Sequence, residues 1–382
     1  MEKLKVHEKY CLRDIAIVSQ GFTFSRSYQG KKNLKWNYFK VADIGLNPNS
    51  KYLTNAINTI SDITMEEIGA LPFPKGSIVF PRVGAALFNN NKKILAQDGV
   101  VDDNVLVLTV TDTSKCWHEF LYYYLQGIPL AKWCNSGLVP VINTKTVLSQ
   151  MVFLPSLPEQ QKIATILSTQ DKVIELKEKR LAQKQQQKKY LMQQLLTGKK
   201  RLPGFNGEWQ FAKLENVSKY SASAASFKTY ESHLGCGPYP VYDATGCFGN
   251  IDFYENEQPY ISIVKDGAGV GRVALCKAKS STIGTLGCIF ANDIDLLYLF
   301  YWMSAVDFQI YSNGSTIPHV YYKDYKNVQV HLPCRLEQEA IVEILSTADH
   351  EIDLLQKSIE AEKQKKKALM QLLLTGKVSV RI

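Results

Sequence analysis

Residue types that carry out catalysis occur in this chain, but not at the spacing that catalysis or metal binding requires. Asp102 and Asp103 form an acidic pair, whereas a metal-dependent nuclease needs a larger carboxylate cluster, and the sequence offers no evident third member. The histidines are scattered without metal-site spacing, at His7, His118, His233, His319, His331 and His350. The sequence therefore predicts neither a nuclease centre nor a metal site.

Two short motifs suggest chemistry on DNA or phosphate, and both are better interpreted as turns. Asn47-Pro-Asn-Ser50 is the run nearest to the Asn/Asp-Pro-Pro-Tyr/Phe motif with which DNA amino-methyltransferases grip an exocyclic amine. Asp266-Gly-Ala-Gly-Val-Gly-Arg272 follows a predicted strand, but it matches neither Gly-x-Gly-x-x-Gly nor the Gly-Lys-Ser/Thr pattern. We interpret it as a hairpin turn with Arg272 directed outward. The chain alone is not expected to be an enzyme.

The composition is that of a globular protein with a polyanionic partner. The 382 residues are 45% hydrophobic and 21% charged, which is enough apolar material for two or three cores. Lys and Arg number 45 against 36 Asp and Glu, a formal charge of +9. This surplus favours nucleic acid as a partner and, less strongly, a membrane surface.

The sequence shows no export or membrane signal. No stretch approaches the roughly 18 consecutive apolar residues of a spanning helix, and Met1–His7 lacks the apolar core of a signal peptide. We therefore expect a cytoplasmic protein. The eight cysteines include no Cys-x-x-Cys pair, and we interpret them as small buried residues that the cytoplasm keeps reduced.

An internal repeat dominates the sequence. The segment 154–199 recurs at 332–377, a shift of 178 positions, and 24 of the 46 aligned residues are identical. Both copies begin with Leu-Pro and end with Leu-Leu-Thr-Gly-Lys. Chance does not produce this agreement, so the chain contains the same scaffold twice.

Each copy predicts one long helix. In the first copy Ser156 and Glu159 have the spacing of a capping box, and Pro158 lies in the first turn, where its missing N–H costs nothing. Gly198 and Gly376 stand where a left-handed cap is expected. A helix of about 40 residues is about 60 Å long, which exceeds what one globular core covers.

Both helices carry apolar residues every seven positions. The seam residues are Leu167, Ile174, Leu181 and Leu195 in the first helix and Leu345, Ile352, Ile359 and Leu373 in the second. A lysine interrupts each series, Lys188 in the first and Lys366 in the second. A seven-residue period predicts helix against helix, here an antiparallel coiled coil. The alternative is a pair of ordinary amphipathic core helices.

Ahead of each helix lies a mixed segment with short β-like runs and short helical patterns. Strands are expected at 76–80, 105–110, 151–154, 260–264 and 328–332, and short helices at 117–126 and 295–304. Pro140 and Pro318 are again 178 residues apart. We predict an α+β protein with two globular α/β domains, residues 1–153 and 200–331 (200–207 being a linker), and two helical regions, 154–199 and 332–382.

The repeated motif resembles that of a known family. Leu-Pro-x-x-x-Glu-Gln-x-x-Ile at 154–163 and at 332–341, each opening a helix that ends in Leu-Leu-Thr-Gly, is similar to the conserved regions of type I restriction-modification specificity (S) subunits. The resemblance spans the chain. Cys334 replaces the capping Ser156, and Leu336 replaces Pro158, which weakens the expected cap of the second helix.

The resemblance implies a non-catalytic DNA-reading subunit. In that family each globular segment is a target recognition domain that reads one half of a split DNA sequence. The two domains are expected in a pseudo-twofold arrangement, separated by the paired helices, which set the spacer and dock two methyltransferase (M) subunits. The implied partners are double-stranded DNA, the two M subunits and, in a restriction complex, two restriction (R) subunits. S-adenosylmethionine, ATP and Mg are expected on those partner subunits and no cofactor on this chain.

The residues that contact DNA are predicted by type alone. Arg and Lys read guanine, Asn and Gln read adenine, and any exposed cation or hydroxyl can contact phosphate. Candidates in the first domain are Arg26, Lys31, Lys32, Lys35, Tyr38, Arg82, Asn90, Lys92 and Lys93. Candidates in the second domain are Lys228, Lys265, Arg272, Lys277, Lys279, Asn313 and Lys323. For any one of them the alternative is a solvated surface group.

Two other function classes are open at this point. One is an enzyme with its own methyltransferase or nuclease activity, against which the missing motifs argue. The other is a coiled-coil adaptor or decoy that binds M subunits without reading DNA. Two large and divergent globular domains argue against a simple adaptor.

Overall fold

The computed structural model describes residues 8–46, 50–135, 137, 139–314 and 317–380. The expected turn at Asn47 and the segment Met1–His7 lie outside these residues. The chain divides into two compact units, which are described separately: unit 1 is Met1–Arg180 with Gln356–Ile382, and unit 2 is Leu181–Leu355.

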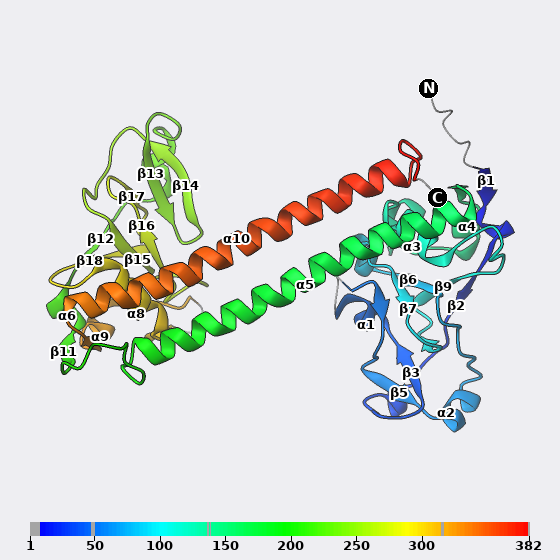
Figure 1. The fold of residues 1–382 in the computed structure, drawn as a ribbon, viewed down its shortest axis with the longest axis horizontal. Coiled ribbons are helices and arrows are strands. Elements are labelled where there is room, and N and C mark those ends of the chain that lie inside the picture. The colour runs from blue at the N-terminus through cyan, green and yellow to red at the C-terminus, as the bar shows by residue number, and fades with distance from the viewer. Residues whose placement is uncertain (1–7, 47–49, 136, 138, 315–316, 381–382) are drawn as a thin grey trace. The chain divides into compact units, whose positions relative to one another are not determined.

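Unit 1 is built on a five-stranded sheet (Figure 1). In spatial order its strands are β2 (Ala16–Gln20), β9 (Val105–Val110), β6 (Ile78–Pro81), β7 (Lys93–Leu95) and β4 (Tyr52–Leu53). Neighbouring strands are antiparallel except β7 and β4, which are parallel. The expected strands at 76–80 and 105–110 are thereby confirmed within two residues.

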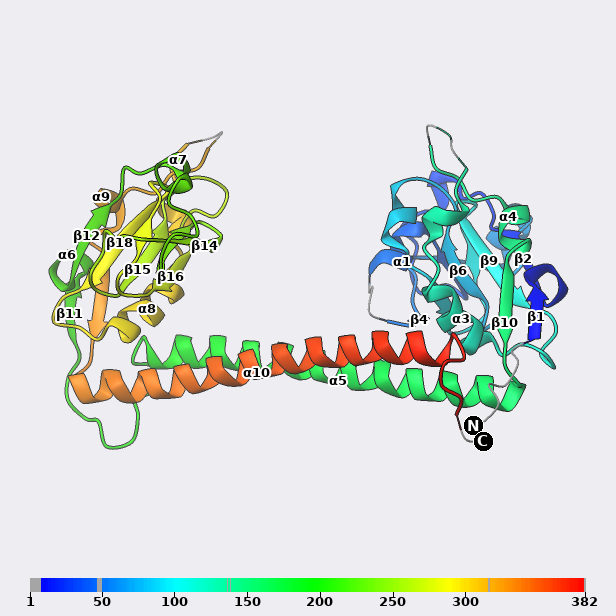
Figure 2. The same ribbon diagram turned by 90° about the horizontal axis from the view of Figure 1, so that it is seen from above.

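This sheet is buried on both faces, because successive residues of its strands point alternately into two cores. Ile78 and Phe80 of β6 belong to the core that includes Phe120 of helix α3 (His118–Gln126). Val79, between them, packs in a second core with Phe39. Helix α3 lies on the side of the sheet that faces the long helices (Figure 2).

Smaller elements complete unit 1. A three-stranded sheet consists of β5 (Asn58–Ile60), β3 (Trp36–Phe39) and β8 (Val100–Val101), and a separate antiparallel pair consists of β1 (Glu8–Cys11) and β10 (Met151–Leu154). The short helices are α1 (Val41–Leu46), α2 (Asp62–Glu67) and α4 (Thr144–Leu148).

Unit 2 contains two sheets and one strand pair. The four-stranded antiparallel sheet has the order β12 (Ser218–Ala222), β18 (Leu286–Ala291), β15 (Tyr260–Val264) and β16 (Val273–Cys276). The three-stranded sheet has the order β14 (Gly246–Ile251), β13 (Tyr239–Asp243) and β17 (Ser281–Thr282). The pair is β11 (Gln210–Lys213) with β19 (Gln329–Leu332). The helices are α6 (Leu214–Val217), α7 (Phe227–Glu231), α8 (Leu296–Ala305) and α9 (Tyr322–Tyr325).

Unit 2 repeats the plan of unit 1. The ladder β12-β18-β15 corresponds to β2-β9-β6, helix α8 corresponds to α3, and the pair β11-β19 corresponds to β1-β10. The repeat therefore extends through the globular segments, although their sequences share few residues. The core of unit 1 and the core of unit 2 are formed by different residues at similar positions in the two segments.

The long helices are α5 (Leu157–Leu195) and α10 (Arg335–Leu373), and both contribute to each unit. Within each unit they are joined by ion pairs between Asp171 and Lys366, Glu178 and Lys363, Lys184 and Glu351, and Lys188 and Asp349. Because residue numbers rise along one helix as they fall along the other, the helices are antiparallel in each unit (Figure 2).

The predicted seam is mostly buried. Six of its eight residues are at most 7% exposed, namely Leu167, Ile174, Leu195, Leu345, Ile359 and Leu373. Leu181 and Ile352 are half-buried. Leu167 and Leu373 also belong to the core of unit 1, and Leu195 and Leu345 to the core of unit 2. The long helices therefore pack against each other and also contribute to the globular cores. In the described residues no helix is both long and apolar enough to cross a membrane.

The C-terminal caps of the long helices are as predicted, whereas the predicted N-terminal capping box is not found. Gly198 and Gly376 adopt φ values of +68° and +69°, as left-handed caps require. The capping box of Glu159 is wrong, because its carboxylate is buried and Oε1 accepts a hydrogen bond from Val380 N at 3.3 Å. The neighbouring Gln160 holds the start of the helix instead, donating from Nε2 to Pro155 O at 2.9 Å.

The cysteines are less uniformly buried than expected. Cys116, Cys276 and Cys288 are buried, and burial raises the pKa of the Cys116 thiol to about 12. Cys236, Cys247 and Cys334 are exposed, so the interpretation of all eight as buried residues is wrong.

Candidate nucleic-acid interface

In unit 1 the loop that follows β6 is held against residues 139–142. Ile142 N donates to Arg82 O at 2.8 Å, and Gly84 N donates to Pro140 O at 3.0 Å. Gly84 has a φ of +81°, a conformation that residues with a Cβ rarely adopt. The cation Arg82 is therefore placed at the end of a buried strand, on a loop that a second loop holds in position.

Unit 2 contains the same arrangement after β15. Val320 N donates to Lys265 O at 2.8 Å, and Gly267 N donates to Pro318 O at 2.9 Å. Gly267 has a φ of +93°. We call each arrangement the paired loops, namely 82–84 with 139–142 in unit 1 and 265–267 with 317–320 in unit 2. Both paired loops have a cation at the strand end and a proline in the second loop.

The side chains carried by the two frames differ. Where unit 1 pairs Val83 with Val141, unit 2 pairs Asp266 with His319. Asp266 Oδ1 lies 2.7 Å from His319 Nδ1, and Asp266 Oδ2 lies 2.7 Å from Lys265 Nζ. Burial by itself would raise the pKa of the Asp266 carboxyl, but these hydrogen bonds bring the pKa below its usual value. The backbone hydrogen bonds of the paired loops are thus the same in both units, whereas the side chains that the loops carry differ.

Exposed groups that can contact DNA surround the paired loops of unit 2. Tyr321 is 47% exposed, its ring stacks on His319, and Lys323 Nζ lies 5.4 Å from the centre of the Tyr321 ring. Asn313 is exposed, and its Nδ2 donates to Asp324 Oδ2 at 3.2 Å. The structure therefore brings the predicted contacts Lys265, Asn313 and Lys323 together at one place.

A second set of cations lies on the unit 1 loop between β2 and β3. Arg26, Lys31, Lys32 and Lys35 are all exposed there. The loop is ordered by hydrogen bonds to β5, including Thr59 N to Lys31 O at 2.9 Å. Lys35 is already paired with Asp62, at 2.8 Å, so the other three are the better candidates for contacts with phosphate.

The structure removes Tyr38, Lys92 and Lys93 from the predicted DNA contacts, because all three are buried. Lys92 Nζ donates to Ile128 O at 2.9 Å, and burial lowers the pKa of the Lys92 ammonium to about 7. Burial also lowers the pKa of Lys93 to about 8, and its Nζ donates to a backbone carbonyl. The Tyr38 hydroxyl donates to Phe22 O.

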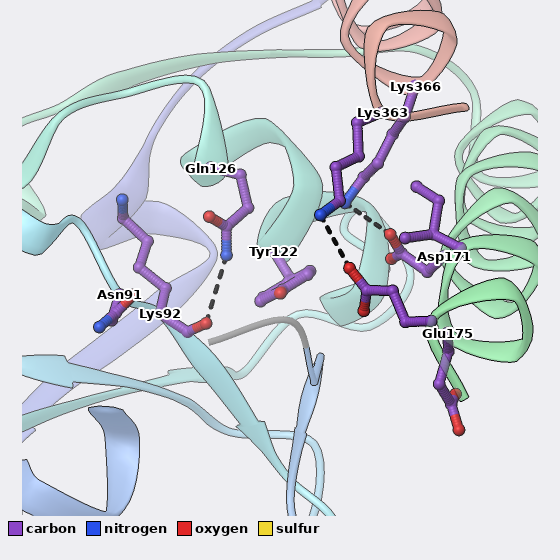
Figure 3. Close-up of a pocket in the computed structure, with 10 residues that line it drawn as sticks. Asn91, Lys92, Tyr122, Gln126, Asp171, Glu175, Lys363 and Lys366 are labelled. Atoms are coloured by element: carbon purple, nitrogen blue, oxygen red, sulfur yellow. Dashed lines mark hydrogen bonds and ion pairs between the residues drawn. The ribbon is translucent and has the colours of Figure 1, made fainter. Parts of the chain in front are cut away.

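Asn90 and the cavity beside it have a structural role. Asn90 adopts a left-handed conformation, and its Oδ1 accepts from Leu130 N at 2.9 Å and from Lys92 Nζ at 2.6 Å. Lys92 helps to line a cavity of about 270 Å³ within unit 1, to which Gln126, Asp171 and Lys366 also contribute (Figure 3). Neither Asn90 nor Lys92 is presented to an external polyanion.

The remaining candidates of unit 2 are exposed but separate. Lys228 lies on α7, and Lys277 and Lys279 follow β16. The run 266–272 is the turn of the β15-β16 hairpin, as predicted. The Arg272 side chain is exposed but not directed freely outward, because Nη2 donates to Ala244 O at 2.7 Å.

Asp102, of the acidic pair, has a structural role. Within the described part of the chain, no group of three or more His, Cys, Asp or Glu side chains could hold a metal ion. Asp102 is buried, and its Oδ1 accepts from Asn104 N at 2.9 Å. This carboxylate therefore orders a turn.

Comparison with known families gives the repeated unit a description. A family model described as the type I restriction modification DNA specificity domain matches residues 5–185 and, a second time, residues 206–363. The chain belongs to this DNA specificity family. The two matches fall on the two segments that carry the paired loops, so the specificity domain occurs twice in one chain.

Two relatives cover most of the chain. The protein named as the type I restriction enzyme MjaX specificity subunit of Methanocaldococcus jannaschii is 25% identical over 405 residues, covering 97% of this chain and 93% of that protein. The MjaVIII specificity subunit of the same organism is 26% identical over 336 residues, covering 77% of each.

Two solved structures have the same fold. The type I restriction-modification S subunit from M. genitalium has a TM-score of 0.65 at 14% identity, covering 98% of this chain and 97% of that one. A chain from a study of complex assembly and conformational transition of the type I R-M system has a TM-score of 0.58 at 14% identity, covering 97% of each.

Sequence reasoning missed one side chain of the candidate interface. His319 was counted among scattered histidines, whereas it pairs with Asp266 inside the paired loops. The signal that could have found it is position, because His319 directly follows Pro318, one of the two prolines that the repeat aligns.

Proposed function

We propose that each globular domain reads one half of a bipartite DNA target through its paired loops. Supporting this is the same loop frame in both units, with a cation at the strand end and different side chains on the frame. A constant frame presents contacts at a fixed place, and variable side chains allow two different sequences to be read. Membership of the DNA specificity family gives the role, and the formal charge of +9 suits a polyanion.

The long helices are the spacing element of this proposal. Each has 39 residues, which corresponds to about 58 Å of helix at 1.5 Å per residue. Ion pairs between α5 and α10 in each unit hold the two helices side by side. Their exposed charged faces, repeated 178 residues apart, offer two similar docking surfaces, so we expect two methyltransferase subunits per chain.

Catalysis belongs to the partner subunits in this proposal. The sequence lacks the methyltransferase motif, and we expect S-adenosylmethionine, ATP and Mg to bind the partner M and R subunits. The complex acts where its DNA target is, in the cytoplasm.

The test is to map modified bases in cells with and without this gene. The proposal expects one bipartite motif, two short sequences separated by a fixed gap, that is modified only when the gene is present. A complex that assembles but modifies no defined motif would instead support the adaptor or decoy function. Mass measurement of the assembled complex tests the ratio of two M subunits to one chain, and a stable one-to-one complex at saturating M subunit would contradict it.

A further inference from the structure

The lysines that interrupt the seam, Lys188 and Lys366, occupy positions where an apolar residue would pack better. A charge at a seam position lowers the stability of paired helices, and such positions are known to specify register. Both copies of the repeat nevertheless keep the lysine. The contacts of the lysine should therefore show why it is present in both copies.

In unit 1 Lys366 joins three elements. Its Nζ lies 2.5 Å from Asp171 Oδ1, and the Tyr123 hydroxyl donates to Asp171 Oδ2 at 2.6 Å. Lys366 Nζ is also 5.8 Å from the centre of the Tyr123 ring. Lys366 comes from α10, Asp171 from α5 and Tyr123 from α3, and Figure 3 shows Asp171 and Lys366 pointing toward each other.

Unit 2 repeats the cluster with the roles of the long helices exchanged. Lys188 of α5 pairs with Asp349 of α10, and the Tyr301 hydroxyl of α8 donates to Asp349 Oδ2 at 2.8 Å. Lys188 Nζ is 5.3 Å from the centre of the Tyr301 ring. All three pairs of equivalent residues are 178 positions apart. We call the two clusters lock 1 (Lys366, Asp171, Tyr123) and lock 2 (Lys188, Asp349, Tyr301).

The locks constrain direction in a way that apolar packing does not. Each aspartate uses one oxygen for the lysine and the other for the tyrosine, so it binds its two partners in a set geometry. Tyr123 is fully buried and Tyr301 is 4% exposed, and burial raises the pKa of both hydroxyls, which therefore remain donors. Leucine contacts alone would allow the domain helix to turn or slide on the seam.

A second tie fixes the other end of the same domain helix. Gln160 Oε1 accepts from Trp117 N at 2.8 Å at the start of α3, and Gln338 Oε1 accepts from Asp295 N at 2.9 Å at the start of α8. Two attachment points define the direction of a helix. Since α3 packs in one core with β6, and β6 leads into the paired loops, the direction of α3 determines where those loops point.

We propose that Lys366, Asp171 and Tyr123, with their counterparts Lys188, Asp349 and Tyr301, are positioning residues that orient each recognition domain on the helices and thereby limit the DNA spacer lengths that the complex accepts. This inference rests on the proposed function. Lock 1 has an additional support, because Lys51 Nζ lies 5.4 Å from the Tyr123 ring centre and donates to Ser168 Oγ at 3.0 Å. Loss of the tyrosine hydroxyl is therefore expected to loosen lock 2 more than lock 1.

The test uses the full chain assembled with its methyltransferase subunits. Tyr123→Phe, Tyr301→Phe and the double variant each remove a hydroxyl and keep the ring. Methylation rates are measured on duplexes that carry both native half-sites with the spacer at its native length or one base pair shorter or longer. Tyr124→Phe is the matched control, because it removes a hydroxyl from the same helix, and that hydroxyl interacts with the backbone of Phe153 instead of with Asp171.

The native spacer should be methylated at an almost unchanged rate by every variant. Tyr301→Phe should reduce the preference for the native spacer over its neighbours by about ten-fold, the factor that corresponds to one hydrogen bond to a charged group, and the double variant should reduce it further. Tyr301→Phe should have the larger single effect, and the control should behave as the wild type.

The contrary results are separable. If the wild-type complex methylates a bipartite site and the double variant keeps the wild-type spacer preference, the locks only add stability and the inference is wrong. If the double variant does not fold, Tyr301→Phe alone decides in the same way. If the wild-type complex methylates no bipartite site, the proposed function itself is wrong, and the inference falls with it.

Discussion

A matched insertion in both long helices tests whether their length sets the DNA spacer. One heptad is added after Arg180 in α5, by duplicating residues 174–180, and one after Leu355 in α10, by duplicating residues 349–355. These sites leave the four ion pairs intact, because the pairs Asp171–Lys366 and Glu178–Lys363 stay in unit 1 and the pairs Lys184–Glu351 and Lys188–Asp349 stay in unit 2.

The size of the effect follows from helix geometry. Seven residues add about 10 Å of helix and rotate it by about 20° from two full turns, so the seam is preserved. At 3.4 Å per base pair, about 10 Å corresponds to a spacer longer by up to about three base pairs. Two residues inserted at the same sites rotate the helix by about 200° and turn the charged faces into the seam.

The assay is the mapping of modified bases in cells that carry each variant. The heptad variant should modify the same two half-sites at a longer spacing, and the two-residue variant should lose folding or assembly. Modification by the heptad variant at the original spacing would refute the proposal that the helices set the distance.

Three further predictions concern single side chains. Arg201→Met should lower the free energy of unfolding, measured in urea titrations, because the buried Glu337 loses its ion pair at 2.8 Å, although it keeps the hydrogen bond from Trp209 Nε1. Lys200→Met, at an exposed site, should have little effect, and equal effects of the two substitutions would contradict this prediction. Burial lowers the pKa of Lys92 to about 7, so above that pH the unfolded chain binds more protons than the folded chain. The free energy of unfolding should therefore rise from pH 7 toward pH 9. Lys92→Met should show a smaller rise. His319→Ala should change the base preference of one half-site only, as mapped from modified DNA, and an unchanged motif would remove this side chain from base reading.

Much of the scaffold was predictable because the sequence repeats at regular intervals. The heptad spacing predicted the paired helices, and the 178-residue shift predicted that both would be alike. The strands at 105–110 and 260–264 followed from their β-branched runs. The heptads and the β-branched runs involve residues close in sequence, so these patterns can be seen without the structure.

Burial of single polar residues was not predictable in the same way. The run Asn89–Lys93 has the composition of a surface loop, yet Lys92 is buried and its Nζ donates to Ile128 O. Lys93 begins a strand whose residues are all buried. Lys366 was visible in the sequence as a seam lysine, but its partner Tyr123 lies 243 positions away. Contacts of this range leave no local pattern.

The central claim is that the two globular domains are independent readers of one DNA target. The most direct measurement replaces residues 8–153 with the corresponding segment of another specificity subunit of known target and maps the modified motif in cells. The account predicts that one half of the motif changes to that of the donor, while the other half and the spacer stay as in the wild type. A motif in which both halves change, or in which neither half changes, would contradict it.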